Sequence, residues 1–303
     1  MFAALITPIL FSFSAVSGQK VAVELGAIAG NLVRLFVAGV ILGLIVMVTS
    51  PETLSSITFP WFFVSGVIGF GIGDIGLFLA YERIGSRLTM LLNLCLAPVF
   101  AIALEWGWLG TTVSGPVLLC ILTILLGVTM ALRPGAKSRQ KMQRRGNFGW
   151  GVFWAIVAGF GQGTGAVISR KAEAIATFNG IASTGISAAF QRVLAGFVFA
   201  LLVFVVLRIF RSRLLTGGTG LTRKGGFWLL GAALFGPVIG VSCFQWALQS
   251  LESGIVLAVV ALTPVVLIPL AAVFEGDHPT RLAICGAIVA VIGVACLNLF
   301  AGG

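Results

Sequence analysis

Ten apolar runs, each about 20 residues long, limit what this chain can fold into more than any other feature. An α-helix of that length crosses the hydrocarbon core of a bilayer, whereas membrane β-strands alternate apolar and polar residues over shorter stretches. Only 9% of the residues are charged, against about 25% in soluble domains. The sequence therefore predicts an all-α integral membrane protein with ten transmembrane helices. We expect these helices at residues 2–18, 28–48, 60–81, 88–106, 112–132, 149–170, 186–207, 226–249, 254–274 and 280–300.

The sequence pattern offers no cluster suited to a metal or to catalysis. The five cysteines all fall inside apolar runs without close-paired spacing, which is typical of small core residues. The single histidine, His278, lies in a short loop before the last run. No phosphate-binding GxxxxGK[ST] motif occurs either. We therefore expect no cofactor, no metal and no enzymatic activity.

The second half of the chain repeats the first. The spacing from Pro98 to Gly127 equals that from Pro264 to Gly293, 29 residues in both cases. Other markers recur in the same order: "AVSGQK" (15–20) as "AVISRK" (166–171), "VRLFVAG" (33–39) as "QRVLAG" (191–196), and "LAPVF" (96–100) as "LTPVV" (262–266). This order predicts a first five-helix repeat at 1–134, a basic linker at 135–147 and a second repeat at 148–303.

Each repeat holds five runs, so the second repeat must be inverted in the membrane relative to the first. Inverted repeats are typical of secondary transporters, which bind substrate near the midplane between the halves and rock one half against the other. The alternative is an old duplication that is kept only for packing.

Basic residues give the chain a net charge of +10, and they cluster in connections between runs. The segments 133–147 and 208–226 hold eleven of the nineteen lysines and arginines. Because these connections are short and tethered, we expect them to contact anionic lipid and not nucleic acid. Fifteen of the nineteen lie in odd-numbered connections and two in even-numbered ones. The positive-inside rule then predicts odd connections in the cytoplasm and both termini outside.

Several markers together resemble a known family. Each half has a lysine near the end of its first run (Lys20, Lys171) and an arginine inside its second (Arg34, Arg192). The second half ends its fourth run with the acidic "VFEGDHP" (273–279), whereas in the first half that acid is either missing or replaced by Glu105 further inside the run. These features resemble the drug/metabolite transporter superfamily, in its ten-helix EamA type, and within it the YddG-like amino acid exporters. The resemblance implies a central cavity lined by the first, third, fourth, sixth, eighth and ninth helices. It also implies cytoplasmic termini, opposite to the charge count.

Asp74, in "GFGIGDIG" (69–76), is the acid that stands out inside an apolar run. A Gly-x-Gly-Asp run occurs in intramembrane aspartyl proteases, but those need a second aspartate to share a proton. The other aspartate, Asp277, lies in a loop, which argues against a protease. Asp74, Phe78 and Tyr81 share one helical face, where a carboxylate and two aromatic rings suit a substrate's ammonium group.

The alternative for Asp74 is an ion pair with Arg34, Arg192 or Lys20 that fixes helix packing. The three cations themselves either bind a substrate carboxylate or serve structure by reaching the membrane interface. Four more polar or amphipathic candidates inside the runs either line the cavity or bond neighbouring helices together. They are Asn93, Gln162, Gln245 and Trp246, and Glu105 is a further candidate for proton coupling.

We therefore expect a secondary transporter of small metabolites, most of all amino acids, that exports them by alternating access. The expected location is a bacterial inner membrane, with membrane lipid and the small-molecule substrate as partners. A multidrug or organic-cation exporter and a lipid flippase or scramblase are the alternatives. The choice between monomer and homodimer stays open.

Overall fold

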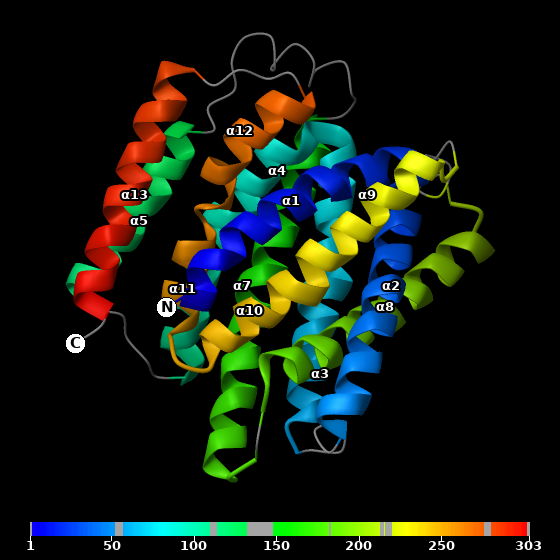
Figure 1. Cartoon of the computed structure of the whole chain (residues 1–303), viewed down its shortest axis with the longest axis horizontal. Helices are drawn as coiled ribbons and strands as arrows, with labels where there is room; N and C mark the ends of the chain where they lie inside the picture. Colours follow the sequence, from blue (N-terminus) through cyan, green and yellow to red (C-terminus); the bar gives the residue numbers. More distant parts are fainter. Residues whose placement is uncertain are drawn as a thin grey trace.

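The computed structural model describes residues 2–51, 57–109, 114–131, 148–181, 183–212, 215, 220–275 and 280–301. Every regular element among these residues is helical (Figure 1). The α-helices are α1 (Phe2–Leu25), α2 (Ala27–Thr49), α3 (Phe59–Gly66), α4 (Asp74–Leu104), α5 (Gly115–Ala131), α7 (Phe148–Phe178), α8 (Gly185–Ile209), α9 (Arg223–Ala233), α10 (Ile239–Leu248), α11 (Ser253–Val260), α12 (Thr263–Glu275) and α13 (Arg281–Ala301). Three π-helical segments adjoin them: η2 (Val67–Gly73), η3 (Glu105–Leu109) and η5 (Leu234–Val238). The predicted linker 135–147 and the loop with Asp277 and His278 lie outside the described residues.

Ten membrane crossings account for these helices. Within the described ranges, seven helical segments are long and apolar enough to cross a membrane, judged by length and composition. One of them, Phe59–Trp108, has 50 residues and turns at Gly85, where φ is 79° and ψ is 169°. Because this positive φ breaks the helix and favours glycine, the segment makes two crossings. The shorter apolar helices Gly115–Gly127 and Ile284–Gly293 complete the ten that the sequence predicts.

Two of the predicted boundaries are wrong by more than a few residues. Helix α1 continues to Leu25 and α7 continues to Phe178, so Lys20, Arg170 and Lys171 lie inside helices and not in the connections that follow. The apolar run marks only the part of a helix that lies at the depth of the hydrocarbon core. Because each further helical residue keeps its backbone hydrogen bond, the helix extends into the polar interface without an apolar signal.

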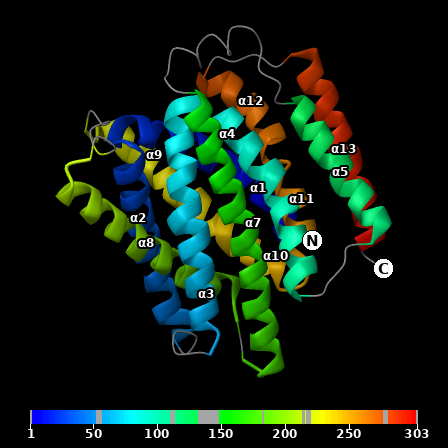
Figure 2. The same cartoon turned by 180° about the vertical axis from the view of Figure 1, so that it is seen from behind.

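The helix ends gather at two opposite faces of the molecule (Figures 1 and 2). The upper face is the end that is uppermost in Figure 1, where α1 leads into α2, where α5 ends and α7 begins, and where α12 ends and α13 begins. The lower face is the end where α2 ends, where α7 leads into α8, and where α10 leads into α11. Corresponding helices of the two halves pack together, α2 with α8 and α5 with α13, as expected for inverted repeats.

The third crossing of each half contains a π-helical turn, η2 in the first and η5 in the second. Such turns are frequent at functional sites. Glycines here let the halves approach closely, because a Cβ atom on Gly71 would lie 2.8 Å from the ring of Phe199. A Cβ atom on Gly196 would overlap that of Phe70. The glycine-rich third crossing is therefore an interface between the halves.

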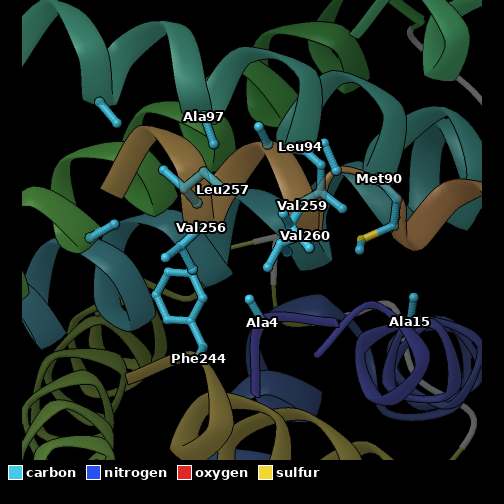
Figure 3. Close-up of a cluster of buried hydrophobic side chains, with 14 of the residues drawn as sticks. Ala4, Ala15, Met90, Leu94, Ala97, Phe244, Val256, Leu257, Val259 and Val260 are labelled. Carbon is cyan, nitrogen blue, oxygen red and sulfur yellow. The ribbon is translucent and has the colours of Figure 1, made fainter. Parts of the chain in front are cut away.

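Helix α11 lies in the middle of the largest hydrophobic cluster among the described residues. Figure 3 shows Val256, Leu257, Val259 and Val260 of α11 between α4 and the helices α1 and α10. These four side chains have no exposed surface. Inside a bilayer such burial stabilises a fold through close packing, since lipid tails are as apolar as the side chains themselves. Helix α11 is therefore a packing centre around which other crossings are held.

Helices α5 and α13 are joined through a reciprocal pair of glycines. A Cβ atom on Gly127 would overlap the backbone nitrogen of Ala290, and one on Gly293 would lie 2.7 Å from the side chain of Ile124. Each glycine therefore receives the backbone or side chain of the facing helix, a common way for membrane helices to pack closely. Gly127 and Gly293 are also the two glycines that end the equal 29-residue spacing of the repeats, so the repeated spacing coincides with this contact.

We predict that Gly127→Ala destabilises the protein, because the added methyl group meets backbone atoms that cannot move aside. The expected loss is about 1–3 kcal/mol, as for other overpacked sites. Thermal unfolding in detergent measures it. Gly115→Ala is the matched control, since a Cβ atom there has nothing within 4 Å. Equal melting temperatures for the two variants would contradict the glycine contact.

Candidate functional site

A buried ion pair joins the second crossing to the third. The Arg34 guanidinium donates from Nη2 to Oδ2 of Asp74, and from the same nitrogen to Oδ1 of Asn31 at 3.0 Å. The Arg34 side chain is 6% exposed and that of Asp74 is 14% exposed. Asp74 is the first residue of α4, directly after η2, so the π-helical turn sets where its carboxylate points. Of the three cations considered from sequence, Arg34 is the partner of Asp74.

Aromatic rings cover this ion pair on one side. The Cζ atom of Arg34 lies 4.9 Å from the ring centroid of Phe78, a cation–π contact. The Phe78 and Tyr81 rings are 5.6 Å apart, and the Tyr81 hydroxyl donates to Sδ of Met90 at 3.1 Å. Asp74, Phe78 and Tyr81 do share one helical face, as their spacing predicts. The ring of Phe78, however, already faces a cation of the protein itself.

Arg192 of α8 is buried on the other side, with 2% exposure. Its Cζ atom lies 5.2 Å from the ring centroid of Phe70. Among the described residues its guanidinium has no ion pair and no hydrogen bond, and its buried Nε atom is without a partner. Asp74, which pairs with Arg34, is not within salt-bridge distance of Arg192. The two arginines that correspond in the repeats thus differ, because only Arg34 has a carboxylate against it.

These groups surround a cavity between the two halves, with a volume of about 60 Å³. A space of that size holds a few water molecules. In its wall, the Oδ1 atom of Asn93 is buried without a hydrogen bond. Seven of the ten candidate residues line the cavity: Asp74, Phe78, Tyr81, Asn93, Gln162, Arg34 and Arg192.

Twelve further wall residues were not candidates, and four of them carry an aromatic ring or a hydroxyl. These four are Phe11, Ser14, Phe70 and Phe244. Phenylalanine and serine are common throughout the apolar runs of this chain, so no signal in the sequence separates these four from other core residues.

The helices around the cavity differ in part from those that the family resemblance implies. The first, third, fourth, sixth and eighth crossings contribute to its wall, but so do the second and seventh, through Arg34 and Arg192. The ninth crossing contributes no residue to the described wall. The reason is that α11 is enclosed by its own hydrophobic contacts in the core.

Three candidates lie outside this wall. Gln245 is fully buried and donates from Nε2 to Oγ of Ser169 at 3.3 Å, which is a contact between helices. Trp246 is 57% exposed and lines a separate groove. Lys20 is partly exposed on α1 and is not part of the cavity wall. Sequence position alone could not tell these three residues from the seven that line the cavity. Each helix has several faces, and the position of a residue along the chain does not show which face meets the cavity.

A buried polar layer lies on α7 between the cavity residue Gln162 and the lower face. The Ser65 hydroxyl of α3 donates to the carbonyl of Gly165 at 2.6 Å and lies 2.8 Å from Oγ of Ser169. Gln245 of α10 adds its bond to the same Ser169 hydroxyl. The layer therefore joins α3 of the first half to α7 and α10 of the second. Single serines in apolar runs carry little signal, so the layer could not be predicted from sequence.

A second polar cluster centres on Glu105, which is 1% exposed. Its Oε1 atom accepts from Nη1 of Arg170 at 3.0 Å and from the backbone nitrogen of Ser253 at 3.2 Å, and also from the Ser253 hydroxyl. Arg170 also lies 3.9 Å from Oε1 of Glu252. This cluster joins η3 of the first half to α7 and α11 of the second. Because one carboxylate oxygen accepts three donors, Glu105 acts as a charged link between helices here.

Comparison with known proteins identifies the family. The model of the EamA-like transporter family matches residues 1–133 and 149–299. The chain belongs to the EamA-like transporter family. A solved crystal structure, described only as that of a protein, aligns over 100% of this chain and 98% of its own length. Its TM-score is 0.71 at 14% sequence identity, which shows a shared fold. No protein with a curated description matches the sequence.

Membership of the EamA family indicates a multi-pass membrane transporter of small molecules and not an enzyme. The two matched segments each cover five crossings and leave out 134–148 between them.

We predict that Asp74→Asn lowers both stability and transport, and that a second substitution separates the two effects. Asp74→Asn leaves the Arg34 charge buried beside an amide, and breaking a buried pair in this way costs about 3–5 kcal/mol. Adding Arg34→Gln removes that unpaired charge, so stability returns towards that of the unchanged protein. Transport stays low because the cavity has lost its carboxylate and one of its two guanidinium groups.

Thermal unfolding in detergent and flux in liposomes are measured on the same preparations. Recovery of both stability and transport in the double variant would mean that the pair serves packing alone.

Proposed function

We propose that this EamA protein exports amino acids by alternating access through the cavity around Asp74. The observation that carries the proposal is a buried cavity between inverted halves whose wall combines charges of both signs with aromatic rings. Buried charges inside a membrane are expensive and commonly mark paths of substrates or ions. A cavity of this composition suits a small zwitterion with an apolar side chain.

The chemistry of the wall matches the parts of such a substrate. Guanidinium groups bind carboxylates through paired hydrogen bonds. The unpaired Oδ1 atom of Asn93 offers an acceptor to an ammonium group. The rings of Phe11, Phe70 and Phe244 supply an apolar surface for the side chain. The 60 Å³ volume fits an occluded state that must expand to admit substrate.

Alternating access requires a closed barrier on one side of the cavity at a time. The segment of α7 from Gly165 to Arg170 supports such a barrier, because two sets of hydrogen bonds join it to other crossings. The layer at Ser169 links it to α3 and α10, and the cluster at Glu105 links it to η3 and α11. Both sets join one half of the protein to the other. We propose that these contacts form the barrier at the lower face and break when that face opens.

At the upper face the halves are joined by a more exposed contact. The hydroxyl of Thr222 donates to the carboxylate of Glu24, at 3.1 Å to the nearer oxygen. Exposed hydrogen bonds exchange readily with water and resist separation less than buried ones. Helix α5 ends and α7 begins at this face, and the sequence between these two helices is rich in lysine and arginine. We therefore propose that the upper face lies in the cytoplasm of a bacterial cell and is the entry side of an exporter.

Flux in proteoliposomes tests the substrate class. We expect saturable exchange of neutral amino acids with apolar side chains, faster than exchange of a sugar or of tetraphenylphosphonium, measured with radiolabelled solutes. Imposing a proton gradient shows whether transport is coupled to protons. Movement of the organic cation without any amino acid flux would overturn the proposal in favour of a cation exporter.

Thiol labelling tests the barrier. In a variant without native cysteines, Ser14→Cys places a thiol in the cavity wall. We expect Glu105→Gln to raise its labelling by a membrane-impermeant maleimide from the lower face by about tenfold, since charged hydrogen bonds each contribute about 1.5–3 kcal/mol. Glu24→Gln, at the upper face, is the matched control and leaves lower-face labelling unchanged. Equal labelling in both variants would contradict a barrier at Glu105.

Lipid handling is a second candidate, because one feature favours it. An open groove of about 550 Å³ lies between α2, α8 and α10 and is lined mostly by apolar surface, with Leu42, Ile186, Ile239 and Trp246 among its residues. It shares no lining residue with the charged cavity. A dithionite assay on liposomes with fluorescent lipids decides this candidate. Lipid movement that persists after Asp74→Asn would favour it.

A further inference from the structure

The cavity wall carries two guanidinium groups and one carboxylate, and the carboxylate is already paired. We infer that Arg192 is the anion-binding site of the cavity, and that the substrate's own carboxylate pairs with it. This inference rests on the proposed function in one respect, since it takes the cavity as the substrate site. It adds that the substrate must be a carboxylate and that Arg34 does not hold it.

Burial is the first argument. Arg192 is 2% exposed, lies in a membrane-spanning helix and has no carboxylate within salt-bridge distance among the described residues. An unpaired charge in such a place costs several kcal/mol, which a protein offsets only with a partner, a ligand or water. Arg192 is part of the cavity wall, so a ligand in the cavity lies beside it.

The surroundings of the Arg192 guanidinium fix its position without neutralising it. A Cβ atom on Gly69 would lie 2.9 Å from Nη2, and one on Gly165 would lie 3.1 Å from the same atom. The Phe70 ring covers the guanidinium at 5.2 Å from its centroid. Two glycines and one ring therefore hold the arginine without supplying an anion. A group held in this way binds an anion with little loss of side-chain entropy.

The asymmetry of the repeats is an independent argument. Both halves keep the arginine of the second crossing, but "GFGIGDIG" (69–76) contains an acid and the corresponding "LFGPVIGVS" (234–242) contains none. Arg34 therefore has Asp74 and Asn31 as acceptors, whereas no described residue accepts from Arg192. A site that binds an organic cation needs an acid without a partner. In this cavity the acid Asp74 is paired and the cation Arg192 is not, which indicates an anionic group on the substrate.

The experiment compares three ligands that share one ring and differ in charge. They are phenylalanine, phenylalaninamide, which lacks the carboxylate, and 3-phenylpropionate, which lacks the ammonium group. Each competes against binding of labelled phenylalanine to the purified protein in chloride-free buffer. We expect the two carboxylates to bind at least about tenfold more tightly than the amide, as for other charge-assisted hydrogen bonds. In Arg192→Gln this preference should fall to nearly one.

Arg223→Gln is the matched control, because Arg223 is exposed at the start of α9 and the substitution removes the same charge. It should keep the preference. If Arg192→Gln does not fold, Gly69→Ala keeps the charge and presses on Nη2, and it should reduce the preference several-fold. Gel filtration in detergent confirms that each variant is folded.

The outcomes separate the two proposals. If 3-phenylpropionate binds through Arg192 but no amino acid is transported, the amino acid proposal fails and the anion site stands. If amino acids are transported but the amide binds as well as the acids, or the preference survives Arg192→Gln, the anion site is overturned and the transporter proposal stands.

Discussion

The ion pair between Arg34 and Asp74 is the interaction on which the rest of the cavity depends. Inside a bilayer each charge alone costs several kcal/mol, and the two offset each other only when they touch. This requirement fixes the second crossing against the third at the level of the π-helical turn η2. Asp74 is also the only acid in the described wall of the cavity. Because Arg34 pairs with it, Arg192 is the charged group of the wall that remains for a ligand.

The cavity also depends on the close approach of the two halves. The glycines of the third crossing bring it against α7 and α8, where Gly73 faces Gly161 and Gly66 faces the backbone of Arg192. Such contacts replace the hydrophobic effect, which gives little drive between helices in lipid. In the proposed cycle they would also let the halves move relative to each other, because smooth backbone surfaces slide more easily than interlocked side chains. In the proposed cycle, the polar contacts at Ser169 and Glu105 then determine which face of the cavity is closed.

Much of the fold could be predicted from sequence, because a bilayer admits few kinds of spanning structure. Apolar runs of helical length fix the number of crossings, and an odd number per repeat fixes the inversion. The face shared by Asp74, Phe78 and Tyr81 followed from helical spacing. Helix ends did not, since α1 and α7 continue past their apolar runs. Gln245 and Trp246 occupy adjacent positions, yet one is fully buried and the other is 57% exposed, and hydropathy cannot tell these faces apart.

By itself the sequence determined the helical class, the ten crossings and the duplication, because these depend only on the length, polarity and order of segments along the chain. Only the tertiary structure decided that Asp74 pairs with Arg34, that Arg192 is left without an acid against it among the described residues, and that α11 packs in the core instead of lining the cavity. The physical reason is that pairing and burial depend on distances between helices, which lie far apart in the sequence. Two arginines with the same place in their repeats therefore have different partners.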